Sequence, residues 1–132
     1  MSLSVQIVTP RSVAWSGQAL EVLAPGELGE IGVFANHCAL LTTLKAGVVK
    51  VRTESGTERF VVGAGFAEAG AERVVILTES CEEPGRLNAG TVEADLADAE
   101  ARLKTAIAGS AEHLSLTRRV ALARARQAAL KT

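Results

Sequence analysis

Aromatic residues and long apolar runs are scarce in this sequence. Only 3% of its 132 residues are aromatic, with one tryptophan, three phenylalanines and no tyrosine. Proteins that stack nucleobases or sugars depend on such rings, so this composition disfavours both kinds of binding face. No apolar segment approaches the roughly 20 residues that a membrane-spanning helix needs. The net charge of −1 also argues against a protein that binds nucleic acid over its whole surface.

Cysteine is equally sparse. Cys38 and Cys81 are the only two in the sequence, and their separation fits no metal-binding spacing and does not by itself define a disulfide. Isolated thiols of this kind are usual in a reducing compartment. Residues 1–6 lack the basic start and the apolar stretch of a signal peptide. We therefore expect a cytoplasmic protein.

Few residues are placed to carry catalysis. His37 and Cys38 are neighbours, but adjacent side chains of an extended segment point to opposite sides and cannot share a hydrogen bond. Gly63 and Gly65 superficially match a dinucleotide-binding fingerprint, yet Glu68 stands where the third glycine would be. A bulge or the close packing of strands explains these glycines better. We predict that the chain is not an enzyme and holds no metal or cofactor.

The composition changes near residue 90. Residues 1–90 contain 11 of the 12 glycines and all three prolines, whereas alanine dominates the remainder. Short apolar strands punctuated by glycine are typical of an antiparallel sandwich, and no helical stretch separates them as a parallel α/β sheet would require. The sequence thus predicts an antiparallel β-sandwich of about ten short strands over residues 1–87 and a C-terminal α-helical hairpin over residues 88–132.

Individual strands are indicated by alternating or continuous apolar residues. The clearest alternation places Leu3, Val5 and Ile7 on one face. Further strands are predicted over residues 19–23, 48–52, 59–62 and 74–77, with turns at residues 24–26 (Ala-Pro-Gly) and 54–57 (Glu-Ser-Gly-Thr). The second of these turns predicts a hairpin, because Gly56 accepts a positive φ.

Two helices are predicted from apolar positions spaced alternately by four and three residues. Their seams consist of Val92, Leu96, Ala99, Leu103 and Ala106, and of Leu116, Val120, Ala123, Gln127 and Leu130. Thr91 is the expected N-cap of the first helix and Gly109 its stop. Ser110 or Ser115 is expected to cap the second helix. Because alanine side chains bury little area, we expect the hairpin to be less stable than the sandwich and to be mobile or dependent on a partner.

The helical part is also the more basic. Residues 91–132 carry 7 basic and 5 acidic side chains, against 7 and 10 in residues 1–90. No acidic residue follows Glu112, so the last helix is expected to be a local cation; its candidate contact residues are Arg118, Arg119, Arg124 and Arg126. Such a face is either simply solvated or binds an acidic partner. A protein partner is favoured over a membrane because this helix lacks tryptophan and phenylalanine.

Four segments resemble one known family, the epsilon subunit of F-type ATP synthases, whose mitochondrial equivalent is called delta. The resemblance is carried by residues 29–37 (Gly-Glu-Ile-Gly-Val-Phe-Ala-Asn-His), residues 40–47 (Leu-Leu-Thr-Thr-Leu-Lys-Ala-Gly), residues 15–17 (Trp-Ser-Gly) and residues 63–68 (Gly-Ala-Gly-Phe-Ala-Glu). The order of a β-rich part and a helical hairpin matches over essentially the whole chain.

Two departures from the family pattern affect what the resemblance implies. Ala35 and Asn36 replace the usual Pro-Gly, although asparagine tolerates a left-handed backbone better than most residues. Some bacterial members bind ATP through an Ile/Leu-Asp-x-x-Arg-Ala motif. The aligned residues 96–101 have Ala97 for the aspartate and Glu100 for the arginine, and a glutamate there would repel phosphate. We therefore expect no ATP binding and no other cofactor.

The resemblance implies a non-catalytic rotor subunit in the central stalk of a proton-translocating ATP synthase. The sandwich would contact the gamma subunit and the membrane ring of c subunits, and the hairpin would approach the catalytic beta subunits, and the alpha subunits with them, to hinder ATP hydrolysis. The implied gamma contact is His37, Cys38, Leu41 and Thr42; the implied c-ring contact is Glu27, Leu28, Gly29 and Glu30; the implied inhibitory contact is the four arginines named above. The expected location is peripheral, on the cytoplasmic face of a bacterial inner membrane.

A second hypothesis stays open on the residues alone. The chain would then be a generic β-sandwich protein-binding module with a basic helical tail. Affinity for a gamma subunit separates the two, because only a rotor subunit requires it.

Overall fold

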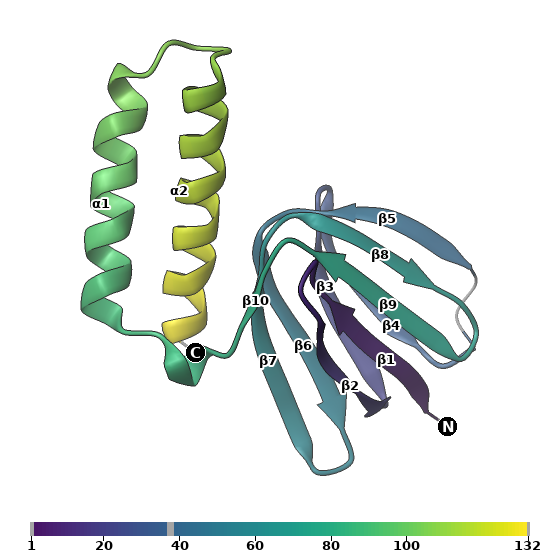
Figure 1. The fold of residues 1–132 in the computed structure, drawn as a ribbon. Coiled ribbons are helices and arrows are strands. Elements are labelled where there is room, and N and C mark those ends of the chain that lie inside the picture. Colours follow the sequence, from purple (N-terminus) through teal and green to yellow (C-terminus); the bar gives the residue numbers. More distant parts are fainter. Residues whose placement is uncertain (1, 37–38, 132) are drawn as a thin grey trace.

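The computed structural model describes residues 2–36 and 39–131, so His37 and Cys38 of the expected gamma contact lie outside the described residues. The strands are β1 (Leu3–Val8), β2 (Val13–Ala19), β3 (Glu21–Gly26), β4 (Gly29–Phe34), β5 (Leu40–Leu44), β6 (Gly47–Thr53), β7 (Gly56–Val62), β8 (Gly65–Ala69), β9 (Arg73–Thr78) and β10 (Cys81–Glu82). A 3-10 turn (Pro84–Arg86) leads to the helices α1 (Ala89–Thr105) and α2 (Ala111–Leu130). The predicted β-sandwich followed by a helical hairpin is confirmed (Figure 1).

The strands form one continuous sheet that folds over itself. Its order is β10-β7-β6-β3-β5-β8-β9-β1-β2, and β4 pairs with β3 beside this path. Among the described strands, β1 and β9 are the one parallel pair, and the other neighbours run antiparallel as predicted. Folding the sheet brings the inward side chains of both layers together, which creates the core.

The core is built from small and medium apolar side chains. Leu3, Val5 and Ile7 are completely buried, which confirms the alternation expected for the first strand. Val49 and Val51 of β6 and Val74 and Ile76 of β9 are buried by the same period-two rule, with their neighbours facing outward. This two-layered body positions the surfaces of the sandwich that are described below.

The structure corrects the predicted strand at residues 19–23 and the turn after it. β2 ends at Ala19 and β3 begins at Glu21, and residues 24–26 continue β3. Proline is tolerated there because the described pairing of β3 with β6 ends at Leu23, so the missing N–H of Pro25 costs no ladder bond on that side. The chain turns later, between Gly26 and Gly29.

The predicted hairpin at Gly56 and the predicted cap at Ser110 are confirmed, whereas the predicted cap at Thr91 is wrong. Gly56 has a φ of 142° at the β6–β7 hairpin, and the Ser110 side chain accepts from the His113 N–H at the start of α2. Thr91, however, is not the N-cap of α1. The helix begins at Ala89, and the side chain of Asn88 accepts from the Thr91 N–H at 3.0 Å. Asparagine is as good a cap as threonine or better, so the helix starts earlier.

The structure also shows where α1 ends and which backbone conformation Asn36 adopts. α1 ends at Thr105, before Gly109 is reached, and Gly109 adopts a φ of 84° in the connection to α2. Gly109 therefore reverses the chain between the helices and does not terminate α1. Asn36 has a φ of 65°, the left-handed conformation that asparagine tolerates better than most residues.

Gly65 confirms the close packing of strands expected around residues 63–65. A Cβ added at Gly65 would lie 1.9 Å from the carbonyl oxygen of Leu77 on β9. Replacing Gly65 with alanine is expected to lower the free energy of unfolding by about 2–4 kcal/mol, because backbone atoms must move apart. Urea denaturation measures the change. Gly70→Ala is the matched control, since an added Cβ meets no described atom within 4 Å, and equal losses in both variants would contradict the packing argument.

Candidate interaction surfaces

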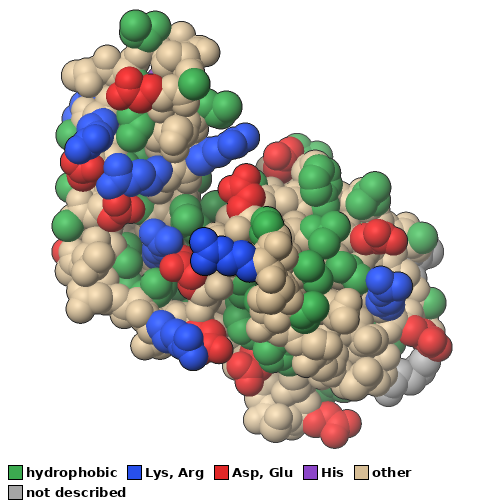
Figure 2. Space-filling model, viewed as in Figure 1, with side chains coloured by type: hydrophobic (Ala, Val, Ile, Leu, Met, Phe, Trp, Pro, Cys, Tyr) green, Lys and Arg blue, Asp and Glu red, His purple; other side chains and the backbone are tan. Residues whose placement is uncertain are grey.

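An apolar row crosses the outer face of the sandwich. It consists of Phe66 on β8, Leu77 on β9, Val8 on β1 and Val13 on β2, which stand opposite one another in the registers of these strands. Phe66, Leu77 and Val13 are 51%, 45% and 51% exposed, and Val8 is half-buried. Large apolar side chains aligned on one open face mark an interaction site more often than isolated ones do. Figure 2 shows hydrophobic side chains gathered over the sandwich, with acidic side chains at their margin.

A groove of about 540 Å³ lies along this row. Phe66 and Leu77 contribute apolar lining, and Glu27 and Glu79 bring carboxylates to it. The groove therefore suits an apolar segment that carries basic side chains at its edges.

The expected gamma contact is only partly brought to this face. Leu41 points outward and is 72% exposed, and its neighbour across the strands is Glu68. Thr42 is half-buried and, as the next residue in β5, points to the other side of the sheet. Sequence reasoning missed Phe66 and Leu77. The continuous apolar run over residues 74–77 was a usable signal, because a strand with water on one side alternates whereas a strand covered on both sides does not.

The expected c-ring contact forms the exposed turn between β3 and β4. Glu27, Leu28, Gly29 and Glu30 are all exposed, and Leu28 shows 106% of its reference area. Gly29 has a φ of 139°, which a residue with a side chain rarely adopts. The Thr43 hydroxyl donates to Glu27 Oε2 at 3.0 Å. The turn is thus held next to β5 and presents an apolar side chain between two carboxylates.

The hairpin is docked on the sandwich through α2 (Figure 1). Ala125 and Ala129 pack on Val61 of β7, with Val48 and Leu122 at the margin of this small cluster. A guanidinium from the sandwich adds a polar contact, because Arg59 Nη2 donates to the carbonyl oxygen of Ala129 at 2.7 Å. A cation at the C-terminal end of a helix is also favoured by the helix dipole.

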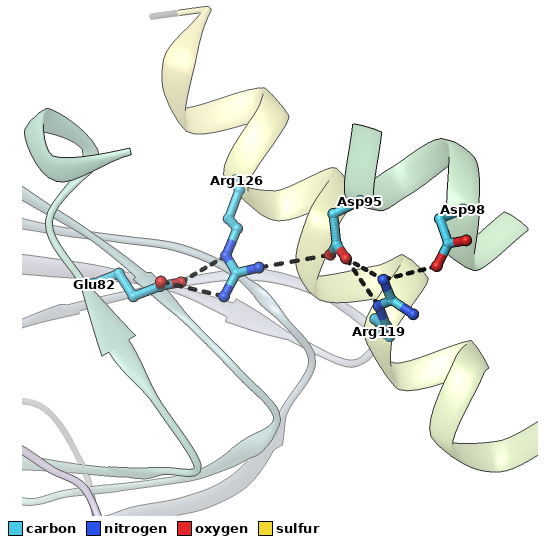
Figure 3. Close-up of polar contacts among 5 residues, drawn as sticks. All are labelled: Glu82, Asp95, Asp98, Arg119 and Arg126. Carbon is cyan, nitrogen blue, oxygen red and sulfur yellow. Dashed lines mark hydrogen bonds and ion pairs between the residues drawn. The ribbon is translucent and has the colours of Figure 1, made fainter. Parts of the chain in front are cut away.

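A network of ion pairs runs from the sandwich through both helices (Figure 3). Arg126 of α2 donates from Nε and Nη2 to the two carboxylate oxygens of Glu82 in β10, at 2.7 and 3.2 Å. Arg126 Nη1 lies 3.9 Å from Asp95 on α1. Arg119 donates from Nε to Asp95 Oδ1 at 2.9 Å, and from Nη2 to Asp98 Oδ2 at 3.0 Å. Strand β10, α1 and α2 are therefore joined by one set of charges.

These contacts correct the view of the last helix as a local cation. Arg119, Arg126 and Arg124 are paired, the last with Glu100 at 3.6 Å. Arg118 alone of the four candidates makes no ion pair among the described residues. The acids come from α1 and β10, so a count of charges along α2 could not reveal them. Glu100, the residue expected to repel phosphate, lies beside Arg124 of the same hairpin.

Three side chains at this junction have shifted pKa values. Burial alone would raise the pKa of Asp98, but the hydrogen bonds and charges of Arg102 and Arg119 outweigh it and lower that pKa. The hydrogen bond to Asp95 raises the pKa of Arg119. Burial, together with the charges of Glu83 and Glu82, raises the pKa of the Cys81 thiol to about 11. Asp98 and Arg119 thus stay ionised at neutral pH while Cys81 stays protonated.

The described residues were also searched for membrane-spanning helices and for groups of metal-binding side chains. Neither described helix combines the length and hydropathy that crossing a bilayer requires. Within residues 2–36 and 39–131, no cluster of three or more histidine, cysteine, aspartate or glutamate side chains is arranged to hold a metal ion.

Comparison with known families places residues 2–84 in one sequence family. The matching model is described as the β-sandwich domain of the ATP synthase delta/epsilon chain. A chloroplast ATP synthase epsilon chain from Stigeoclonium helveticum is 36% identical over 106 residues, which cover 80% of this chain and 78% of that relative. An ATP synthase epsilon chain from Brevibacillus brevis is 41% identical over 102 residues, covering 76% and 77%.

Solved structures of similar fold come from ATP synthase assemblies that include the c ring. A chain in the mitochondrial ATP synthase of Euglena gracilis superposes with a TM-score of 0.86 at 19% identity, over 98% of this chain and 81% of that one. A chain in the central stalk and c ring of the Tetrahymena thermophila enzyme gives 0.65 at 14% identity, over 98% and 97%. At these identities the matches show a shared fold, and that fold includes the helical hairpin.

Proposed function

Because the chain belongs to the delta/epsilon family of ATP synthase subunits, and is accordingly a non-catalytic subunit of the central stalk of that complex, we propose that its sandwich joins the gamma subunit to the ring of c subunits. Residues 1–87 form the joining part in this proposal, and residues 88–132 form a regulatory part. The chain is a peripheral subunit of the membrane-bound complex. We place it on the cytoplasmic face of a bacterial inner membrane.

The observation that carries the gamma contact is the exposed apolar row. Phe66 and Leu77 are opposite each other in the strand register and are each about half exposed to water. Covering these apolar side chains with a partner lowers the free energy. Leu41 lies one row away on the same outer face and extends the contact. Aromatic side chains at the centre of such a patch commonly carry a large share of the binding energy. The gamma subunit would therefore seat an apolar segment on this row, with its basic side chains facing Glu27 and Glu79.

The c-ring contact rests on the turn between β3 and β4. Leu28 is fully exposed between Glu27 and Glu30, and the hydrogen bond from Thr43 fixes the base of the turn. Basic or polar loops of the c ring would meet the two carboxylates, while Leu28 is covered at the contact. Glu27 also lines the groove beside the apolar row. The two contacts therefore adjoin at one end of the sandwich, so that one body meets both partners.

The proposed inhibitory role of the hairpin rests on its arginines. In the docked hairpin Arg119, Arg124 and Arg126 face internal carboxylates, so they approach the catalytic beta subunits, and the alpha subunits beside them, only after rearrangement. Arg118 is exposed and is ready for such a contact without rearrangement.

Binding to the gamma subunit tests the proposal. The purified full-length chain, mixed with a purified gamma subunit from a bacterial ATP synthase, is expected to co-elute with it on size exclusion as a one-to-one complex. A generic binding module has no reason to form this complex. Separate elution of the two proteins at micromolar concentration would overturn the rotor contact.

A further inference from the structure

The row of outward side chains on the sandwich continues beyond Phe66. Phe66 pairs with Thr43 on β5, and Thr43 is exposed on the same outer face as Leu41. Next to Thr43 lies Glu27, the first residue of the turn between β3 and β4. The apolar row thus ends in a hydroxyl and then a carboxylate. Phe66, Thr43 and Glu27 all line the groove of about 540 Å³.

Hydrogen bonds fasten the base of this turn to β5. The Glu27 N–H donates to the Thr43 carbonyl at 3.2 Å, and the Lys45 N–H donates to the Pro25 carbonyl at 3.0 Å. These two bonds flank the one residue pair that joins β3 to β5 in the described part of the chain. The Thr43 hydroxyl adds a third bond, because it donates to Glu27 Oε2 at 3.0 Å. Thr43 therefore holds both the backbone and the side chain of Glu27.

The second carboxylate expected in the c-ring contact faces away from this groove. Glu30 pairs with Pro25 in the β3–β4 register. It lines a separate hollow of about 290 Å³ together with Lys45 and Lys50. Leu28 lines neither hollow and is fully exposed. The two glutamates therefore have different surroundings, although both were expected to serve one contact.

We propose that Thr43 is a positioning residue for the gamma contact and directs the Glu27 carboxylate into the groove, where it receives a lysine or arginine of the segment seated there. The Thr43 bond uses one carboxylate oxygen, so Glu27 keeps accepting capacity for such a cation. The identity of the partner rests on the proposed function, whereas the orientation of Glu27 is a property of the isolated chain. The proposed c-ring contact is thereby narrowed to Leu28 and Glu30.

A carboxylate held in place selects a cationic partner better than a mobile one does. Glu27 is exposed, so an unrestrained side chain would occupy several rotamers and lose that freedom on binding. The Thr43 hydroxyl removes part of this entropy cost before the partner arrives. Glu79 brings a second carboxylate to the same groove. Together the two carboxylates favour a segment with basic side chains over a neutral or acidic one.

Surface plasmon resonance with a purified bacterial gamma subunit tests the role of Thr43 in the full-length chain. Thr43→Val keeps the shape of the side chain and removes the hydroxyl, so gamma binding is expected to weaken about threefold. Thr43→Ser retains the hydroxyl and should bind as the wild type does. Thr57→Val is the matched control, because Thr57 is an exposed threonine on β7 outside the groove, and it should leave gamma binding unchanged.

The double variant separates the positioning of Glu27 from packing. Glu27→Gln removes the charge and should weaken gamma binding about tenfold at low salt and less at high salt. Without that charge the hydroxyl no longer directs a cation-binding group, so adding Thr43→Val to Glu27→Gln should weaken binding no further. In Thr43→Val the amides of Glu27 and Lys45 should exchange hydrogen as in the wild type, because their backbone bonds remain. Additive losses of affinity, or faster exchange of these amides, would overturn the positioning role.

Binding to purified c rings completes the test. Glu27→Gln should bind c rings as the wild type does, whereas Glu30→Gln should bind them more weakly and bind gamma normally. Equal weakening of gamma binding by Glu27→Gln and Glu30→Gln would overturn the division of the turn between two partners. A wild-type chain that fails to bind gamma would overturn the proposed function. Wild-type binding that persists unchanged in Thr43→Val and Glu27→Gln would overturn the role of Thr43 and leave the proposed function standing.

Discussion

Replacing Phe66 with aspartate is expected to weaken binding of the chain to the gamma subunit about 100-fold or more. Phe66 is the one aromatic member of the apolar row and stands at its β8 end, between Thr43 on β5 and Leu77 on β9. A carboxylate at this position would have to be desolvated without a partner when gamma covers the row, and that cost is large. Titration calorimetry or surface plasmon resonance with purified gamma measures the change in affinity.

Phe34→Asp is the matched control for this experiment. Phe34 is 52% exposed, almost the same as Phe66, but it lies on β4, which pairs with β3 and not with the strands of the apolar row. Both substitutions replace a half-exposed phenylalanine with aspartate and should have similar effects on stability. Equal weakening of gamma binding by the two variants, or none by Phe66→Asp, would mean that the apolar row is not the gamma contact.

The strands and helices follow closely from local sequence patterns. Leu3, Val5 and Ile7 are buried because one face of β1 meets the opposite layer. The alternation of apolar and polar residues in this segment predicts that burial. The misplaced turn at residues 24–26 shows the limit of such patterns. Proline and glycine are treated as turn residues, but Pro25 lies in β3 where its missing N–H is not needed. That depends on where the neighbouring strand ends, which a local pattern does not contain.

The candidate surfaces were less accessible to sequence reasoning than the fold. The acidic turn at residues 27–30 was found because it is contiguous in the chain. The apolar row combines residues from four strands, and only the register brings Phe66 beside Leu77 and Leu77 beside Val8. Arg126 and Glu82 are likewise far apart in sequence. Contacts of this kind arise from tertiary packing, so the charge of α2 looked unpaired when read along the chain.

Removal of the hairpin is expected to raise ATP hydrolysis by the assembled complex roughly fivefold or more, if residues 88–132 are regulatory. A chain that ends at Leu87 lacks residues 88–132 but keeps Leu87, which packs at the margin of the cluster under α2, and it keeps the whole apolar row and the acidic turn. It should therefore still bind gamma and assemble. Hydrolysis is measured on complexes reconstituted with either chain, and an unchanged rate in a fully assembled complex would refute the regulatory role.

Arg118→Glu separates a direct inhibitory contact from a loosened hairpin. Arg118 makes no ion pair among the described residues, so its reversal should leave docking intact and raise hydrolysis toward the rate of the truncated chain. Arg126→Glu acts in two opposing ways, because it breaks the pair with Glu82 while repelling an acidic partner. Higher salt should raise ATP hydrolysis by the complex with the wild-type chain more than by the complex with Arg118→Glu, because salt screens exposed charge contacts. The complex with Arg118→Glu could hydrolyse ATP at the wild-type rate while the complex with the truncated chain hydrolyses it faster. In that case the helices hinder rotation by their bulk and not through this charge.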